Sequence, residues 1–433
     1  GATVSRKRIK EKTMGRVPEG PPHLPTLAAS PSPPMPPSSS RPAPPSAGRN
    51  WSDLPHDALV SVLHRLIPSP LPDAGVFTLA DFSAAAAALA PFAPVSRAWR
   101  AAARAAVAEL AAALPPLLWE GPPYYRSVHG YSIFYCPVER RPYRKPMPAA
   151  LSRLAICVGF SQGYLIATEG VPMEAAEAAG TAFALAVVNP FTGDAICGLP
   201  ELPQQCLRSP SAAALSAPPD SPGCVLVAFE AGKVFHSRVS DPAWATETAP
   251  AGIRCVCSAA TCGRRVYALT SNWKLLVMEF PSSSPHRIKM ALLEPGGALR
   301  PGAAELGGAL RPRAAVSLAD SGDGELLAVK AVGCDSFFWA TGKFVVYRMD
   351  FAAGNWVTLQ GLGSRALFVD CYGHVVFAEP GRWGGQRNCV YFTSVLRRAV
   401  GVFNMEDGSV KYMQSNMRFY RATDMWILPG MCS

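Results

Sequence analysis

The chain has few charged residues and no long apolar run. Asp, Glu, Lys and Arg together make up only 17% of its 433 residues. No segment reaches the roughly 18 consecutive apolar residues that a membrane-spanning helix needs, so we expect no membrane partner. Residues 1–50 also lack the apolar centre of a secretory signal. We therefore expect a protein of the nucleus or cytoplasm, or of both, with mostly reduced thiols.

Residue patterns that carry catalysis or bind metals are equally sparse. The 7 histidines include no pair at metal-site spacing, and His374 fits an ordinary strand or turn histidine. The 12 cysteines offer no pair of the short hooks that hold zinc. Phosphate-binding, serine-hydrolase, metalloprotease and zinc-deaminase motifs are absent from the sequence. We therefore expect no enzyme, no cofactor, and neither a catalytic nor a metal site.

The net charge of +10 suggests nucleic-acid binding until the charges are located along the chain. Residues 1–50 hold 8 basic and 2 acidic residues, whereas the other 383 residues hold 33 and 29. The excess lies mainly in the first segment, and the rest of the chain is close to neutral. We therefore expect no nucleic-acid partner.

The first segment, residues 1–50, also contains 12 of the 43 prolines. Proline fixes φ and removes an amide donor, so neither helix nor sheet is expected there. The segment is predicted to be a disordered, basic, proline-rich tail. The basic run at residues 5–10 fits a nuclear address, and an organellar transit peptide is the alternative.

A helical pattern follows over residues 51–113. Four apolar residues have the i, i+3, i+4, i+7 spacing of an amphipathic helix, namely Leu59, Val62, Leu63 and Leu66. Next comes a stretch in which 17 of the residues 84–113 are alanine, and Pro91 and Pro94 divide it. The region predicts a small helical module. Its apolar face is either a docking surface for another protein or packed only on its own chain.

Two parts of this region resemble the F-box, the module by which substrate receptors dock on the Skp-type adaptor of a cullin ubiquitin ligase. Residues 51–66 have the pattern Trp-x-Asp-Leu-Pro-x-Asp-x-Leu-x-x-Val-Leu-x-Arg-Leu, and residues 95–100 are Val-Ser-Arg-Ala-Trp-Arg. The resemblance implies a set of docking residues. These are Leu54, Pro55, Leu59, Val62, Leu63, Leu66, Val95, Trp99 and Arg100. Two departures from the F-box pattern leave open a degenerate F-box that no longer docks. The gap before Val95 is long, and Ser96 stands in place of the usual cysteine.

Beyond residue 114, short apolar runs alternate with Gly, Pro, Asn and Asp, which predicts strands. The expected strands are 154–159, 164–168, 183–188, 224–229, 233–238, 266–269, 275–280, 326–332, 344–349, 356–359, 366–369, 375–377, 389–393 and 400–404. Many short strands without a long helical period favour an all-β sandwich, barrel or propeller. The length suits a propeller of about six or seven blades of ~45 residues each.

Several motifs of this β-rich region resemble, in order, the C-terminal domain of plant F-box proteins, which is thought to be a kelch-like propeller. They lie at 116–119, 159–165, 188–193, 362–369 and 384–392. The turn at 189–193 is predicted to close a strand as part of the scaffold.

The resulting fold class is α+β multidomain, with a tail (1–50), an F-box (51–113) and a propeller-like domain (114–433).

This resemblance implies the substrate-recognition subunit of an SCF-type ubiquitin ligase. The F-box would dock on the Skp-type adaptor, and through it on the cullin, while the propeller would bind a protein substrate whose identity the sequence does not reveal. The alternative is a propeller scaffold for protein interactions, with a degenerate F-box, that acts outside the ligase.

Overall fold

In the computed structural model, residues 51–433 form one compact unit. The described residues are 54–66, 78–120, 131–169, 184–196, 199–203, 211–221, 223–238, 241–253, 255–281, 287–297, 299, 316–332, 342–371, 373–394, 397, 399–414 and 424–429. The predicted tail and the proline-containing gap after the first helix lie outside the described residues.

The described residues contain three α-helices, α1 (His56–Leu66), α2 (Leu79–Leu89) and α3 (Arg97–Ala112). The alanine-rich stretch is divided near Pro91, as predicted. However, α2 begins several residues before the alanines, because Thr78 and Asp81 form a capping box. The Thr78 hydroxyl accepts a hydrogen bond from the Asp81 amide at 3.1 Å, and the Asp81 carboxylate accepts one from the Thr78 amide at 2.9 Å.

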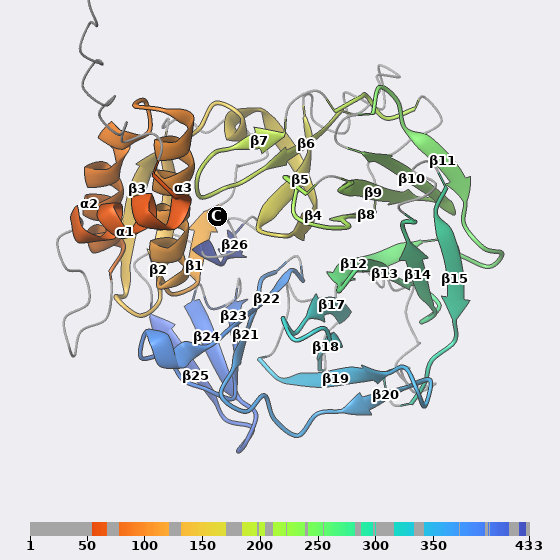
Figure 1. The fold of residues 1–433 in the computed structure, drawn as a ribbon. Coiled ribbons are helices and arrows are strands. Elements are labelled where there is room, and N and C mark those ends of the chain that lie inside the picture. The colour runs from red at the N-terminus through yellow and green to blue at the C-terminus, as the bar shows by residue number, and fades with distance from the viewer. Residues whose placement is uncertain are drawn as a thin grey trace, which may run out of the picture. The chain divides into compact units, whose positions relative to one another are not determined.

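The strands of the described residues form six sheets around a central axis, which is a six-bladed β-propeller (Figure 1). Blade 1 contains β26 (Asp424–Ile427), β1 (Leu117–Glu120), β2 (Tyr131–Cys136) and β3 (Arg141–Pro146). Blade 2 contains β4 (Leu154–Ser161), β5 (Tyr164–Glu169), β6 (Ala184–Val188) and β7 (Ala195–Ile196). Blade 3 contains β8 (Ala212–Leu215), β9 (Val225–Glu230), β10 (Lys233–Arg238) and β11 (Ala245–Thr248).

The other three blades complete the ring. Blade 4 contains β12 (Val256–Cys262), β13 (Arg265–Thr270), β14 (Leu275–Glu279) and β15 (Lys289–Leu293). Blade 5 contains β17 (Val316–Asp320), β18 (Leu326–Ala331), β19 (Phe344–Asp350), β20 (Asn355–Thr358) and β16 (Gly296–Gly297). Blade 6 contains β22 (Val375–Ala378), β21 (Ala366–Val369), β23 (Cys389–Ser394), β24 (Ala399–Asn404) and β25 (Val410–Gln414). The propeller prediction is confirmed, and the expected strands correspond to observed ones within a residue or two.

The ring is closed by a strand from the far end of the chain. Strand β26 pairs antiparallel with β1, with Leu118 opposite Trp426. Trp426 is fully buried, and its indole Nε1 donates a hydrogen bond to the Val369 carbonyl oxygen at 3.1 Å. Blade 1 is thereby built from both ends of the propeller sequence and tied to blade 6. Closure pairs the strands from the two ends of the ring with each other.

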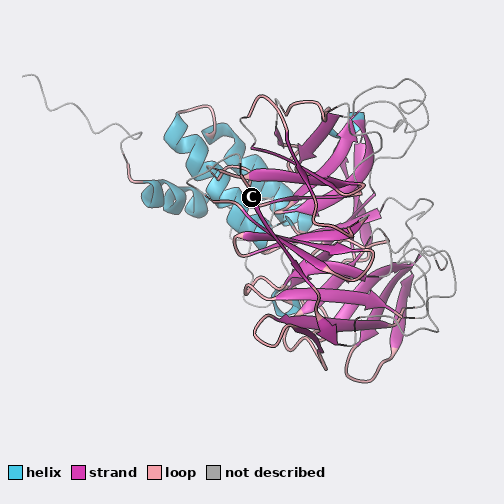
Figure 2. Cartoon of the chain, turned by 90° about the vertical axis from the view of Figure 1, so that its right-hand side faces the viewer, coloured by secondary structure: helices cyan, strands magenta, loops and turns pink. Residues whose placement is uncertain are grey.

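The three helices lie against one side of the propeller (Figure 2) and share a core with blades 1 and 2. Phe191, in the predicted turn after β6, joins the two parts. Its ring centroid lies 5.3 Å from that of Phe82 on α2 and 5.9 Å from that of Phe134 on β2. The turn presents Phe191 because Asn189 Oδ1 accepts hydrogen bonds from two successive backbone amides at 2.9 Å each.

Candidate functional site

The structure divides the nine predicted docking residues into an interior set and an accessible set. Leu59, Leu63 and Trp99 are buried in the core that the helices share with the propeller. Leu54 and Val62 are half-buried and pack against the same core. The accessible residues are Pro55, Leu66, Val95 and Arg100. The docking role of all nine stays a prediction, and the accessible four are the ones that a partner can contact without rearrangement of the helices.

Local hydrogen bonds fix the start of α3, where the second half of the F-box pattern lies. The Ser96 hydroxyl accepts a hydrogen bond from the Trp99 amide at 3.3 Å and so caps the helix. Trp99 stacks on Phe92 with a centroid separation of 5.4 Å. The Arg100 side chain donates to the Ala93 carbonyl oxygen at 3.1 Å. Serine at position 96, a departure from the family pattern, is therefore compatible with an ordered helix start.

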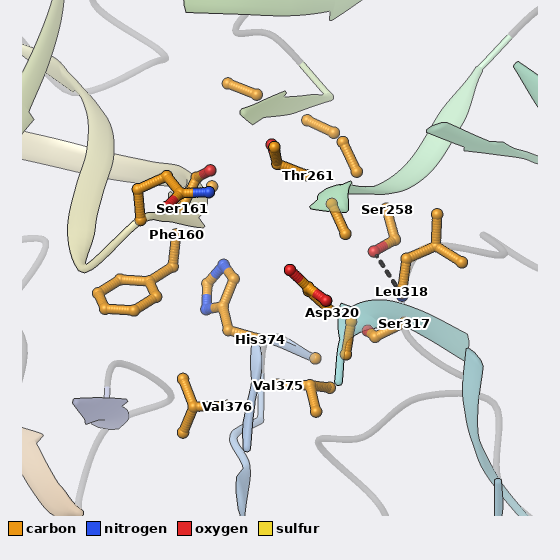
Figure 3. A pocket seen from close by; sticks show the side chains of 18 of the residues that line it. Phe160, Ser161, Ser258, Thr261, Ser317, Leu318, Asp320, His374, Val375 and Val376 are labelled. Carbon is orange, nitrogen blue, oxygen red and sulfur yellow. Dashed lines mark hydrogen bonds between the residues drawn. The ribbon is translucent and has the colours of Figure 1, made fainter. Parts of the chain in front are cut away.

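A second candidate site is the cavity on the propeller axis, with a volume of about 610 Å³. Its walls come from the innermost strand of five blades, namely β4, β8, β12, β17 and β22, and from Leu428 just after β26. Small side chains dominate these strands. Figure 3 shows hydroxyl and carboxylate groups of Ser161, Thr261 and Asp320 among the apolar side chains of this cavity. The volume is that of a small-molecule pocket.

Side-chain hydroxyls link the innermost strands, which belong to different sheets and lack a common backbone ladder. The Leu215 amide of β8 donates to Ser161 Oγ of β4 at 3.1 Å. The Thr261 hydroxyl of β12 donates to the Leu215 carbonyl oxygen. The Leu318 amide of β17 donates to Ser258 Oγ of β12 at 3.0 Å (Figure 3). These bonds satisfy backbone groups at the axis and fix the shape of the cavity wall.

A cysteine, a histidine and an aspartate form a chain of contacts at this cavity. His374 Nδ1 lies 3.0 Å from Asp370 Oδ2, and His374 Nε2 lies 3.7 Å from Cys157 Sγ. The backbone amide of His374 also donates to Asp370 Oδ1 at 2.9 Å. His374 Nδ1 therefore faces the Asp370 carboxylate, and Nε2 faces the sulfur.

The turn between β21 and β22 holds the two residues of blade 6 in this geometry. The Gly373 amide donates to the Asp370 carbonyl oxygen at 3.0 Å, and the Asp370 amide donates to the His374 carbonyl oxygen at 3.1 Å. Gly373 has a φ of 82°, which glycine adopts without strain. The Asp370 side chain is fully buried and that of His374 is 16% exposed. On the opposite side, a break in the β4 ladder between Cys157 and Gly159 marks a β-bulge.

The electrostatic surroundings of His374 favour its cationic form. Burial by itself lowers the pKa of His374, but the charge of Asp370, the sulfur of Cys157 and hydrogen bonds to both raise it. The outcome is a pKa well above the ordinary histidine value. Asp320 of β17 lines the same cavity as a further acidic group, and Cys257 and Cys371 also line it. This arrangement places a positive charge beside the Cys157 sulfur.

Sequence reasoning missed this site. His374 was expected to be an ordinary strand or turn histidine, and Cys157 was not singled out. A local signal for half of the site does exist, since Asp370 and His374 are four residues apart around a glycine in a turn.

Within the described residues, no group of three or more His, Cys, Asp or Glu side chains is placed to hold a metal ion. In the same residues, no helix is long and apolar enough to cross a membrane.

Comparison with known proteins gives one family match. A family model described as KIB1-4 beta-propeller matches residues 133–404. The F-box itself is not detected by a family model. A search of the curated proteins finds no match.

Solved structures give only weak similarities. One chain belongs to a structure of the mitotic checkpoint complex, with a TM-score of 0.29, 10% identity, and coverage of 66% of this chain and 69% of that one. The computationally designed Ika8 protein has a TM-score of 0.31, 10% identity and coverage of 66% and 72%. A structure of BBS1N in complex with ARL6DN has a TM-score of 0.30, 11% identity and coverage of 67% and 74%. Similarities this weak do not bear on function.

Proposed function

Because this chain belongs to the KIB1-4 β-propeller family, a plant family of F-box-associated propellers, we propose that it is the substrate-recognition subunit of an SCF-type ubiquitin ligase. The KIB1-4 propeller is a protein-interaction domain typical of F-box proteins and is typically non-catalytic. In this proposal, helices α1 to α3 dock on the Skp-type adaptor and the propeller binds a protein substrate. The chain then contributes proximity, which raises the effective concentration of substrate at the ligase.

The observation that carries this proposal is the exposure of apolar residues on the helical segment. Among the described residues, five large hydrophobic side chains are exposed, and two of them, Leu66 and Val95, belong to this segment. Leu66 is 50% exposed and Val95 is 60% exposed. Both positions match the F-box pattern. Apolar residues left exposed beside a well-packed core are typical of surfaces that bind a partner.

The shared core of the helices and blades 1 and 2 supports the same proposal in a second way. Glu139 of blade 1 caps the N-terminus of α2, because its carboxylate accepts a hydrogen bond from the Leu79 amide at 3.3 Å. This places a negative charge at the positive end of the helix dipole. Together with the Phe82–Phe191 contact, it fixes the helices to the propeller. A receptor built in this way holds its substrate at a defined position relative to the adaptor.

The test is binding of the full chain to a purified Skp-type adaptor, measured by co-purification and by titration. We expect the wild-type chain to bind. We expect Leu66→Asp and Val95→Asp each to weaken binding by about 1–3 kcal/mol, which is roughly 5- to 150-fold, because each puts a charge into an apolar contact. Val357→Asp is the matched control, since Val357 is 38% exposed on blade 5. Loss of binding in all three variants, or in none, would contradict the proposed docking face.

The burial of Leu59, Leu63 and Trp99 favours a second candidate function, a propeller scaffold that acts outside the ligase. In that case, these residues serve only the core of the chain. The same titration distinguishes the two functions. A folded wild-type chain that does not bind the adaptor supports the scaffold and overturns the ligase role.

A further inference from the structure

We propose that Cys157 is a nucleophilic thiol and that the axial cavity is a covalent-modification site for small molecules with a carbonyl group conjugated to a carbon–carbon double bond. This site is separate from adaptor docking, because its residues lie on blades 2 and 6 and line the cavity on the propeller axis. The family's protein-binding role does not require it. The proposal rests on geometry, on the character of the cavity and on a contrast with the other cysteines.

The geometry supplies the three parts that an activated thiol needs. The nucleophile is Cys157, with its sulfur 3.7 Å from His374 Nε2. The proton carrier is His374, and Asp370 orients it through the 3.0 Å contact to Nδ1. A cation beside a sulfur favours the thiolate, which is the reactive form. The Cys157 sulfur also lies 3.5 Å from the Gly159 carbonyl oxygen, which can accept the thiol proton but does not stabilise the thiolate.

Four of the other described cysteines show a contrast. Burial raises the pKa of the Cys136 and Cys262 thiols to about 12 and that of Cys224 to about 11. Burial also raises the pKa of Cys389. These four thiols are buried among apolar residues and stay protonated at neutral pH. Cys157 is half-buried and lines a cavity large enough to admit a ligand.

The character of the cavity selects the class of ligand. Its wall is rich in alanine, including Ala212, Ala213, Ala259, Ala260 and Ala319. The wall also carries polar side chains, namely Ser161, Gln162, Ser211, Ser258, Thr261, Ser317, Asp320, Ser321 and His374. A wall of this kind suits a small molecule that has both apolar surface and polar atoms. A conjugated carbonyl compound has this character, and its β-carbon is a soft electrophile that matches a thiolate sulfur.

The chemical step is a conjugate addition. The Cys157 thiolate attacks the β-carbon, and a sulfur–carbon bond forms. The electron pair of the double bond moves through the α-carbon to the carbonyl oxygen, and the His374 imidazolium returns its proton to the resulting enolate. The overall change adds one S–H across one carbon–carbon double bond. No oxidant, reductant or leaving group is needed.

The experiment treats the full native chain with 2-cyclohexen-1-one at pH 7 and follows each cysteine by peptide mass spectrometry. The internal reference is Cys255, a half-buried thiol whose sulfur lies 3.5 Å from the Val256 carbonyl oxygen. Cys136, which is fully buried, reports any unfolding. At pH 7 we expect Cys157 to react about fivefold faster than Cys255.

The variant His374→Gln removes the cation, and we expect it to reduce the Cys157 rate to that of Cys255 without changing the Cys255 rate. Asp370→Asn keeps the acceptor for the His374 amide but removes the charge, and we expect an intermediate rate. Equal rates of Cys157 and Cys255 in the wild-type chain overturn the proposal without reference to any variant. An unchanged Cys157 rate in His374→Gln, with Cys136 still unlabelled, also overturns it.

Discussion

The closing strand of the propeller offers the most direct test of the fold energetics, through the substitution Trp426→Ala. Trp426 is fully buried, and its ring lies edge-on to Phe368 with a centroid separation of 5.0 Å. A buried tryptophan removes about 200 Å² from water, which at about 25 cal/mol per Å² corresponds to roughly 5 kcal/mol. Alanine retains a small part of this burial, and the cavity that remains adds a cost, so we expect a loss of about 4 kcal/mol.

The hydrogen bond of Trp426 can be separated from its packing with a second variant. Trp426→Phe keeps a ring in the core but removes the donor to the Val369 carbonyl oxygen. Val369 is only 1% exposed. We expect a loss of about 2 kcal/mol, of which roughly half is the unsatisfied acceptor. Urea unfolding followed by circular dichroism measures both variants, with Val357→Ala on the surface of blade 5 as the control at under about 0.5 kcal/mol. A loss below about 1.5 kcal/mol for Trp426→Ala would refute the idea that β26 is an integral part of the ring.

Two further predictions concern the helix anchor and the axial histidine. Phe191→Ala should lower the free energy of unfolding by about 3 kcal/mol. It should also speed hydrogen exchange in α2 more than in blade 4, because Phe191 contacts Phe82 of α2. Equal protection of α2 in the wild-type and variant chains would contradict the anchoring role. The pKa of His374 is raised above its unfolded value of about 6.5, so its contribution to stability is complete below about pH 6.5 and is lost as the pH rises through the folded-state pKa. Urea unfolding of wild type and His374→Gln across this range should therefore show a stability difference that shrinks as the pH increases, and a difference that grows would show the sign to be wrong.

The sequence predicted many strands rich in large apolar residues, and the axial strands β4 and β22, but missed the axial strands β8 and β17. Strands β9, β19 and β23 contain runs of branched and aromatic residues, whereas β8 is Ala-Ala-Ala-Leu and β17 is Val-Ser-Leu-Ala-Asp. Alanine and serine are poor strand signals, but the narrow axis requires them. At Gly159 of β4, a Cβ atom would lie 2.1 Å from the Ala213 carbonyl oxygen of β8. The spacing of the innermost strands therefore selects small residues, and in β8 and β17 the usual strand pattern is lost.

Sequence patterns also failed to predict the full arrangement of the candidate sites, for a different reason. Cys157 and His374 are 217 residues apart, and only the closure of the ring brings them together. In the helices, periodicity predicted the apolar stripe of α1 but not what covers it. Leu59 and Leu63 face a core completed by residues such as Trp119 and Phe134 of blade 1, which no local pattern connects to them. Periodicity identifies a stripe, whereas the partner of that stripe is a property of the tertiary structure.

The division of the docking pattern into buried and exposed residues has a consequence for the proposed ligase role. If Leu59, Leu63 and Trp99 hold the helices on the propeller, their substitution weakens adaptor binding by displacing the whole module, and unfolding accompanies the loss. Substitution of Leu66 or Val95, which are exposed, removes contacts with the adaptor alone and leaves the unfolding free energy within about 0.5 kcal/mol of wild type. Measurement of binding and stability on the same variants therefore distinguishes a residue that touches the adaptor from one that only positions the surface.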